Sequence, residues 1–163
     1  MSQSETPPGV SSAAFERALN GFARVVGERW VLRSEEDRRA YSDLYAFDDP
    51  DRHAPSGAVA PATVEEVRAI VRLANEHRIP LWPISRGKNL GYGGAAPRLR
   101  GTLVLDLGRM NRILDVDEKF GYCVIEPGVG FYDLFDQLQR ERIALWMSAP
   151  GQTWGSVMGN ALD

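Results

Sequence analysis

The sequence predicts a mixed α+β domain, and two features of its 163 residues lead to that fold class. Stretches with an apolar residue every three or four positions, which are typical of amphipathic helices, occur in the first, middle and last parts of the chain. Short β-rich runs bounded by turn residues lie between them. The expected order is helices, a β-α-β unit, a glycine-rich loop, further strands, a helix and a final turn.

Composition limits the class of protein further. A formal net charge of −3 and a pI near 5.5 give no general attraction to nucleic acid or to anionic lipid. No apolar run approaches the roughly 20 residues of a membrane-spanning helix, and the first residues lack the basic start and apolar segment of a secretory signal. The single cysteine, Cys123, excludes an internal disulfide and fits a cytoplasmic location, with the periplasm as the open alternative.

The first third of the chain is expected to hold two helices and a loop. Residues 1–10 predict a disordered tail, and residues 11–163 the folded domain. The stretch SEEDRRAYS predicts a short second helix, and DLYAFDDPDRHAPSG, rich in Asp, Pro and Gly, predicts an irregular loop. The first helix is predicted from one apolar face, made of Phe15, Leu19, Phe22 and Val26.

The β-α-β unit follows from residue 58 onward. AVA predicts a strand, Thr63 with Glu66 predicts a capping box, and IPLWPI returns the chain to an extended form. TLVLDL, RILDVD and YCVIEPG predict three more strands, and a final turn leads into SVMGNALD. The apolar stripe expected for the middle helix, which runs to about His77, is Val64, Val67, Val71 and Ala74. The stripe expected for the last helix is Phe131, Leu134, Phe135 and Leu138.

The stretch PISRGKNLGYGGAAP, residues 83–97, is the first candidate binding site. Its glycines let backbone N–H groups approach a ligand closely, and Arg86 and Lys88 lie among them. One interpretation is a simple turn, and the other is an anion nest that suits a pyrophosphate. The run SAPGQTWGSVMGNALD again concentrates small residues and predicts a second surface of close approach.

Two common nucleotide motifs do not fit this loop. A P-loop needs Ser or Thr after the lysine, whereas Asn89 follows Lys88. A Rossmann turn must open a helix, whereas GYGGAAPRLRG contains Pro97 and no helical stripe.

The sequence gives little support for a metal site or a catalytic nucleophile. The chain has two histidines, and neither they nor Cys123 have the spacing of metal ligands. His77 fits the end of a helix, where it complements the dipole, and Cys123 fits a buried, inert thiol in a strand. His53 is open between a solvated loop residue and a site residue. Core or cleft positions are expected for the aromatic residues Trp82, Trp146 and Trp154.

Five blocks of the sequence occur in the same order in a known flavoprotein family. They are HAPSGAVAPATVEEV, IPLWPISRGKNLGYGGAAP, GTLVLDLGRMNRIL, YCVIEPGV and GSVMGNA. In these blocks the chain resembles the family of vanillyl-alcohol oxidase and p-cresol methylhydroxylase. The resemblance implies the N-terminal part of a p-cresol-methylhydroxylase-type FAD-binding domain, a mixed sheet with flanking helices, and FAD as cofactor. The second half of that domain and the substrate or cap domain are expected outside these residues.

The resemblance also implies which residues bind the cofactor. The segment that wraps the FAD pyrophosphate matches Ser85, Arg86, Gly87, Lys88, Asn89, Leu90 and Gly91. The segment near the adenosine end matches Pro127 and Gly128, and the run along the ribityl chain and flavin ring matches Pro150, Gly155, Ser156, Gly159 and Asn160. His53 matches a histidine that assists covalent flavin attachment in some relatives. Lys88 stands where an arginine is usual, Gly151 where some members carry an acidic residue, and Thr153 and Trp154 where residues are smaller.

The activity implied for the complete enzyme is hydride transfer from the benzylic carbon of a 4-alkylphenol to FAD, leaving a quinone methide that water can attack. Oxygen or a cytochrome is the implied electron acceptor, and no nucleic-acid, membrane or metal partner is expected. Within these residues no catalytic group can be named, so the chain alone is expected to be inactive. Two alternatives stay open: a truncated, non-catalytic remnant that binds FAD weakly or not at all, and a non-redox module that binds adenine nucleotides.

Overall fold

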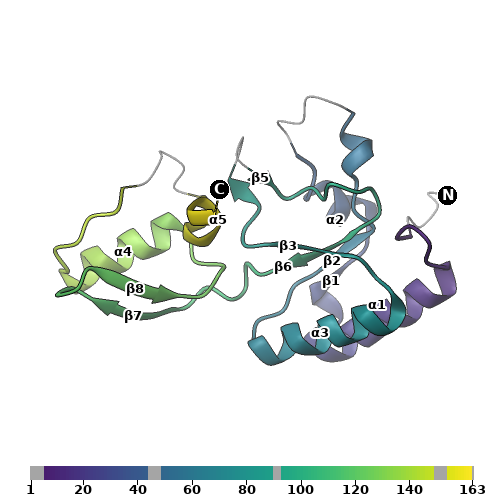
Figure 1. Ribbon diagram of the computed structural model, residues 1–163, viewed down its shortest axis with the longest axis horizontal. Coiled ribbons are helices and arrows are strands. Elements are labelled where there is room, and N and C mark those ends of the chain that lie inside the picture. Colours follow the sequence, from purple (N-terminus) through teal and green to yellow (C-terminus); the bar gives the residue numbers. More distant parts are fainter. Residues whose placement is uncertain (1–5, 44–48, 90–92, 149–153, 163) are drawn as a thin grey trace.

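The computed structural model describes residues 6–43, 49–89, 93–148 and 154–162 of the chain. Its helices and strands form two lobes that lie side by side, with a short helix between them (Figure 1). The elements, in chain order, are α1 (Ser12–Val26), η1 (Glu28–Trp30), β1 (Val31–Leu32), α2 (Glu35–Arg39), η2 (Pro50–His53), β2 (Gly57–Val59), α3 (Val64–His77), β3 (Leu81–Ile84), β4 (Lys88–Asn89), β5 (Gly93–Gly94), β6 (Leu103–Asp106), β7 (Ile113–Asp117), β8 (Tyr122–Ile125), α4 (Phe131–Glu141) and α5 (Val157–Leu162).

The larger lobe, here the sheet lobe, is built on a four-stranded mixed sheet in the order β1-β2-β6-β3. Strand β1 pairs antiparallel with β2, whereas β2 and β3 both run parallel to β6, which lies between them. Helices α1 and α3 pack against each other and cover one face of this sheet (Figure 1). This arrangement confirms the predicted mixed sheet with flanking helices.

Helix α1 forms where the sequence predicts it. Ser11 caps its N-terminus by accepting a hydrogen bond from the Ala14 amide at 3.3 Å, and Gly27 ends it with a φ of 87°. The predicted apolar face is confirmed, because all four of its members, Phe15, Leu19, Phe22 and Val26, are buried. They form the main core together with Val59, Ile70, Leu103 and Leu105.

Helix α3 is present, but its buried face differs from the predicted one. Val64 and Val71 are 49% and 39% exposed, whereas Ile70 and Ala74 are buried against α1 and the sheet. The predicted stripe is confirmed at Ala74 and at Val67, which packs against the main core, and is wrong at Val64 and Val71. A run of valines fits more than one helical face, and packing on α1 selects among them. The cap also differs in detail: Thr63 accepts from the Glu66 amide, but the Glu66 carboxylate accepts from Ala62 rather than from Thr63.

A smaller core covers the opposite face of the sheet. Tyr41, which follows α2, packs there on Ala58, Ile84 and Val104. Its hydroxyl donates to an Asp106 carboxylate oxygen at 2.8 Å. Burial, with the nearby Asp106 charge as the lesser cause, raises the pKa of Tyr41 well above its ordinary value of 10.0. Tyr41 therefore fastens the segment that follows α2 to the end of β6.

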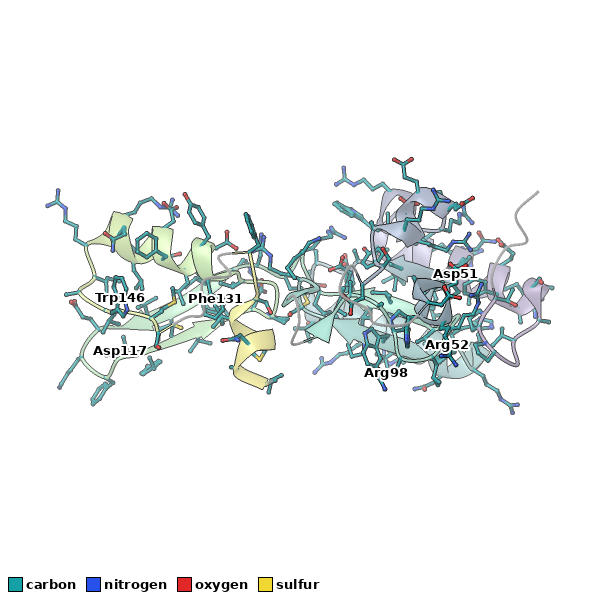
Figure 2. The ribbon with its side chains drawn as sticks, turned by 90° about the horizontal axis from the view of Figure 1, so that it is seen from above. Asp51, Arg52, Arg98, Asp117, Phe131 and Trp146 are labelled. Carbon is teal, nitrogen blue, oxygen red and sulfur yellow. The ribbon has the colours of Figure 1, made fainter. Side chains whose placement is uncertain are left out.

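The second lobe, here the hairpin lobe, comprises β7, β8, α4 and the segment up to residue 148. The antiparallel β7–β8 pair contains one register irregularity and packs on α4 through Val129, Leu134 and Leu138. Phe135 of the predicted stripe is 44% exposed, since a two-stranded ribbon is too narrow to cover that side of the helix. Figure 2 places Phe131 at the inner end of this lobe and Asp117 and Trp146 toward its outer part.

The ends of the described chain also differ from the expectations. The predicted tail is described from residue 6, and there Pro7 is buried and Val10 packs against the main core. The residues after the expected final turn, for which no helix was predicted, form helix α5. No helix in the described ranges is long and apolar enough to span a membrane.

Candidate functional site

A cleft of about 330 Å³ lies at the carboxyl ends of β3 and β6, beside α5. Ligands of sheets with parallel strands commonly bind at this end of the strands. Most of the lining is apolar, and the polar side chains in it are Ser85 and Lys88. The lining residues are Trp82, Pro83, Ile84, Ser85, Gly87, Lys88, Gly94, Leu107, Pro127, Met158, Gly159 and Leu162. Three predicted segments, far apart in the sequence, therefore meet at this cleft.

A second cleft, of about 480 Å³, adjoins the first. Its lining consists of Arg86, Lys88, Asp106, Gly108 and Trp154. Lys88 belongs to both linings, so the two hollows meet at this side chain. One apolar cleft next to one charged cleft suits an elongated ligand that has both a ring system and an anionic part.

The loop between β3 and β4 turns sharply at Gly87. This glycine has a φ of 61°, and a Cβ built on it would lie 2.6 Å from the Cβ of Ala95. The loop is then held by a short hairpin in which Lys88 pairs with Gly94 and Asn89 with Gly93. The hairpin was not predicted from the sequence, because two-residue strands leave no periodic signal. Gly87 is therefore required by the packing of the loop on itself.

The two cations of the loop have different surroundings. Arg86 Nη1 lies 2.6 Å from Asp133 Oδ2 on α4. Lys88 is exposed, and no ion pair or side-chain hydrogen bond engages its ammonium group within the described parts of the chain. Among the described residues that line the clefts, Lys88 thus carries its positive charge without an ion-pair partner.

The serine that precedes Arg86 connects the loop to α5. The Ser85 and Ser156 hydroxyls are hydrogen-bonded to each other, and Ser156 Oγ accepts from the Gly159 amide at 2.8 Å. The Asn160 amide donates to the Ser156 carbonyl, and the buried Gly155 accepts from Phe131 through its own carbonyl. Both predicted small-residue segments thus contact each other, through Ser85 and Ser156.

The segment with Pro127 and Gly128 joins the two lobes. A Cβ on Gly128 would lie 2.6, 2.7 and 2.8 Å from the carbonyl oxygens of Leu107, Gly108 and Met110. The Gly128 amide donates to the Met110 carbonyl at 2.7 Å. A glycine is therefore needed here for close backbone packing, whereas its neighbour Pro127 lines the cleft.

A carboxylate and an arginine fix the approach to this segment. Glu126 is buried, and its carboxylate accepts from the Arg112 amide at 2.9 Å and from Arg112 Nε and Nη2 at 3.0 and 2.7 Å. These hydrogen bonds, the Arg112 side chain first, hold the pKa of Glu126 below its ordinary value. The pair keeps β8 aligned with the start of β7, directly before Pro127.

The remaining predicted site residues lie elsewhere or are not described. His53 lies on η2 with its ring Nδ1 3.1 Å from the Pro97 carbonyl oxygen, and it lines neither of the two clefts. Leu90, Gly91 and Pro150 lie outside the described residues, and of Asn89 only the backbone is described. Figure 2 shows the neighbours of His53, Asp51 and Arg52, in the sheet lobe, on the side away from the hairpin lobe.

Sequence reasoning missed several residues around the clefts. Asp106 ends β6 and accepts from the Tyr41 hydroxyl and the Gly108 amide, so its carboxylate shapes the turn beside the second cleft. A polar residue directly after an apolar strand was the available signal. Asp133 carried no signal, because its partner Arg86 is 47 residues away in the sequence. Trp82 lines the first cleft as expected and the 71% exposed Trp154 the second, whereas Trp146 is 85% exposed and lines neither.

These features fit a dinucleotide cofactor. The apolar cleft can take a ring system, and the exposed Lys88 at the junction can lie beside a phosphate. The described residues hold no group of three or more His, Cys, Asp or Glu side chains that could bind a metal ion. Protein cations and backbone amides are groups that can meet the charge of a phosphate.

Comparison with known proteins identifies the cofactor class. The model of the FAD binding domain family matches residues 55–163, which include both clefts. The chain belongs to this FAD binding domain family. FAD is accordingly its cofactor, as the resemblance predicted.

Relatives of this FAD-binding domain include a 4-cresol dehydrogenase and a decarboxylase. The chain is 39% identical over 96% of its length to the flavoprotein subunit of 4-cresol dehydrogenase (hydroxylating) from Pseudomonas putida, and spans 30% of that protein. It is 40% identical over 94% of its length to 1'-carboxy-chondrochloren decarboxylase from Chondromyces crocatus, spanning 28% of it. The crystal structure of substrate-bound p-cresol methylhydroxylase superposes with a TM-score of 0.93 at 36% identity, covering 97% of this chain and 31% of the other. The predicted family and fold are thereby confirmed.

Proposed function

We propose that this FAD-binding domain is part of an oxidoreductase that acts on 4-alkylphenols. The observation that carries the proposal is the 39% identity, along nearly the whole chain, to the flavoprotein subunit of 4-cresol dehydrogenase. Because the chain spans only about 30% of that relative, the substrate pocket is assigned to residues beyond the clefts described above. The same similarity favours a redox flavoprotein over a non-catalytic remnant or a non-redox adenine-nucleotide module.

In this proposal FAD supplies the redox chemistry by accepting a hydride from the benzylic carbon of the phenol. The chain's own residues bind and orient it. Trp82, Ile84 and Leu107 offer apolar contact to a ring, and Lys88 offers a cation to the phosphates. Gly87 and the Ser85–Ser156 hydrogen bond hold the loop and α5 at a fixed spacing on the two sides of the cofactor.

The electron acceptor and the location belong to the proposal as well. Oxygen and a cytochrome are the two acceptors implied by the family resemblance. A cytoplasmic location is proposed on the basis of the single cysteine, with the periplasm as the alternative.

The first test is cofactor selectivity. Titrating the purified chain with FAD, and separately with ATP and NAD, should give saturable binding of FAD alone, read from quenching of tryptophan fluorescence and from the FAD absorbance spectrum. A Trp82→Phe variant should bind FAD with similar affinity and lose part of the quenching. Tight binding of ATP with no response to FAD would contradict the assignment.

The second test concerns the substrate. The flavin-loaded protein, produced at the full length of its natural reading frame, should lose its oxidised-flavin absorbance when mixed anaerobically with 4-cresol or 4-ethylphenol. The similarity to a decarboxylase makes decarboxylation of a carboxylated substrate the second candidate activity. Flavin that stays oxidised with every 4-alkylphenol, while such a substrate releases carbon dioxide, would favour that candidate.

A further inference from the structure

We propose that Arg86 and Asp133 form a latch between the two lobes, and that Lys88, not Arg86, supplies the positive charge for the cofactor phosphates. The second half of this proposal rests on the FAD-binding function. Arg86 is thereby a positioning residue, and Asp133 gains a role that the sequence did not indicate.

The geometry of Asp133 supports the latch. Its Oδ2 accepts from Arg86 Nη1 at 2.6 Å and from the Gly130 amide at 2.9 Å, so one oxygen serves both the loop and the start of α4. The Arg86 guanidinium packs so closely on Gly130 that a Cβ there would overlap with it. The side chain of Arg86 is 33% exposed and that of Asp133 is 40% exposed, so the pair is partly shielded from water.

Neighbouring contacts join the same two lobes. The Ser85 hydroxyl bonds to Ser156, and Ser156 forms an isolated β-bridge with Gly130. Residues 85 and 86 are therefore held on one side by the end of β3 and on the other by the start of α4 and α5. The position of the loop at the cofactor cleft therefore depends on these contacts between the lobes.

Charge balance separates the two cations of the loop. The Asp133 carboxylate compensates Arg86, so a phosphate at Arg86 would either meet a neutral pair or have to break the latch. Lys88 faces both clefts and has no such partner among the residues that the structure describes. Moving a phosphate toward Lys88 costs no existing ion pair.

The latch is tested without cofactor by a double-mutant cycle. Arg86→Ala, Asp133→Asn and the double variant are compared by urea unfolding, since Asn can still accept from the Gly130 amide. The two single variants should lower the unfolding midpoint by similar amounts, and the double variant by no more than either. The matched control is the cycle of Arg140→Ala and Asp136→Asn, a pair of similar length at 3.0 Å that lies within α4. Additive effects for Arg86 and Asp133, equal to those of the control, would overturn the latch.

The role of Lys88 is tested by the salt dependence of FAD binding. Lys88→Ala should weaken binding roughly three- to fivefold at low salt, and flatten its decline with increasing salt, while leaving the urea midpoint unchanged. Arg86→Ala should keep the wild-type salt dependence. A flattened salt dependence in Arg86→Ala, with none in Lys88→Ala, would overturn this assignment. Wild-type protein that fails to bind FAD would instead reject the proposed function, and the cofactor-free cycle would still decide the latch.

Discussion

The two lobes differ in how completely they bury their own apolar residues. The sheet lobe has a large core in which α1, α3 and the sheet meet, with Phe22, Ile70 and Leu103 fully buried. The core of the hairpin lobe has three buried residues, Val129, Leu134 and Leu138. Of the thirteen large hydrophobic residues that are exposed in the described chain, seven lie in the hairpin lobe, including Phe120 and Trp146, and three lie in the sheet lobe. The sheet lobe has the core of an independent unit, whereas the hairpin lobe does not.

This difference matters because the first cleft lies where the lobes meet. The sheet lobe contributes β3, β6 and the loop with Gly87, and the other side contributes Pro127 and α5. A weakly cored lobe opens more readily than a well-packed one. We therefore expect cofactor affinity to depend on how firmly the hairpin lobe is attached, even when the sheet lobe stays folded.

The largest expected effect separates the lobes directly. Phe22→Ala should lower the free energy of unfolding by about 3–5 kcal/mol, because it empties the centre of the main core. Leu138→Ala should instead loosen the hairpin lobe and leave the sheet lobe folded. Amide hydrogen exchange would show faster exchange throughout the chain in Phe22→Ala, but only in β7, β8 and α4 in Leu138→Ala. Uniform acceleration by both variants would mean that the lobes unfold as one unit.

The next effect concerns the segment with Pro127 and Gly128 that joins the two lobes, here called the joint. Gly128→Ala should cost about 1–3 kcal/mol, because its methyl group would press against three backbone carbonyls between Leu107 and Met110. FAD binding should weaken with it, because Pro127 moves with the displaced backbone. The matched control is Gly121→Ala, in the β7–β8 turn, where a Cβ would meet nothing within 4 Å and only its φ of 66° is unfavourable. Equal FAD affinity for Gly128→Ala and Gly121→Ala would show that the joint does not determine the shape of the cofactor cleft.

Much of the sheet lobe could be predicted from the sequence, because its helices and strands carry periodic apolar residues. The face of α1 was correct in every position, whereas α3 was misassigned at Val64 and Val71, where only packing selects the buried face. In the hairpin lobe Phe135 follows the helical period and is nevertheless exposed, since the ribbon beneath α4 is narrow. Local periodicity reports that a helix has an apolar side, but not how much of that side a partner covers.

The site shows the same limit at the level of single residues. The glycine-rich loop and the Pro127 segment were recognisable from composition and family resemblance, and both line the cleft. The partner of Arg86 was not recognisable, because Asp133 lies on another lobe. Gly128 was expected near the adenosine end of the cofactor from the family resemblance, and the structure adds that its backbone packs closely on three protein carbonyls.

A smaller effect tests the attachment of Tyr41 within the sheet lobe. Tyr41→Phe keeps the ring in its core and removes the hydroxyl that donates to Asp106 at 2.8 Å. The expected loss is about 1 kcal/mol of unfolding free energy, measured by urea titration. The loss should appear in the main unfolding transition, because Tyr41 lies in the sheet lobe. If Tyr41→Phe lost more unfolding free energy than Gly128→Ala, the expected order of the two effects would be wrong.

The smallest expected effect lies in the hairpin lobe and depends on pH. Glu126→Gln retains the side-chain shape and an oxygen that can accept from the Arg112 amide, but removes the charge that Arg112 contacts at 2.7 and 3.0 Å. Because Arg112 is largely exposed, the midpoint of thermal unfolding should fall by only roughly one or two degrees near neutral pH. Exchange in β7 and β8 should rise more than exchange in the sheet lobe.

The sign of the pH dependence follows from the lowered pKa of Glu126. The folded state favours the carboxylate, so this contribution to stability is fully present above the ordinary pKa of 4.5 and is lost as the pH falls through the lower pKa of the folded protein. Wild type and Glu126→Gln should therefore differ most at neutral pH and converge on acidification below pH 4.5. Thermal unfolding measured between neutral and acidic pH decides the point. A difference that grows as the pH falls would mean that Glu126 is held in the folded protein by contacts that favour its protonated form, and that Arg112 does not fix the edge of the weaker lobe.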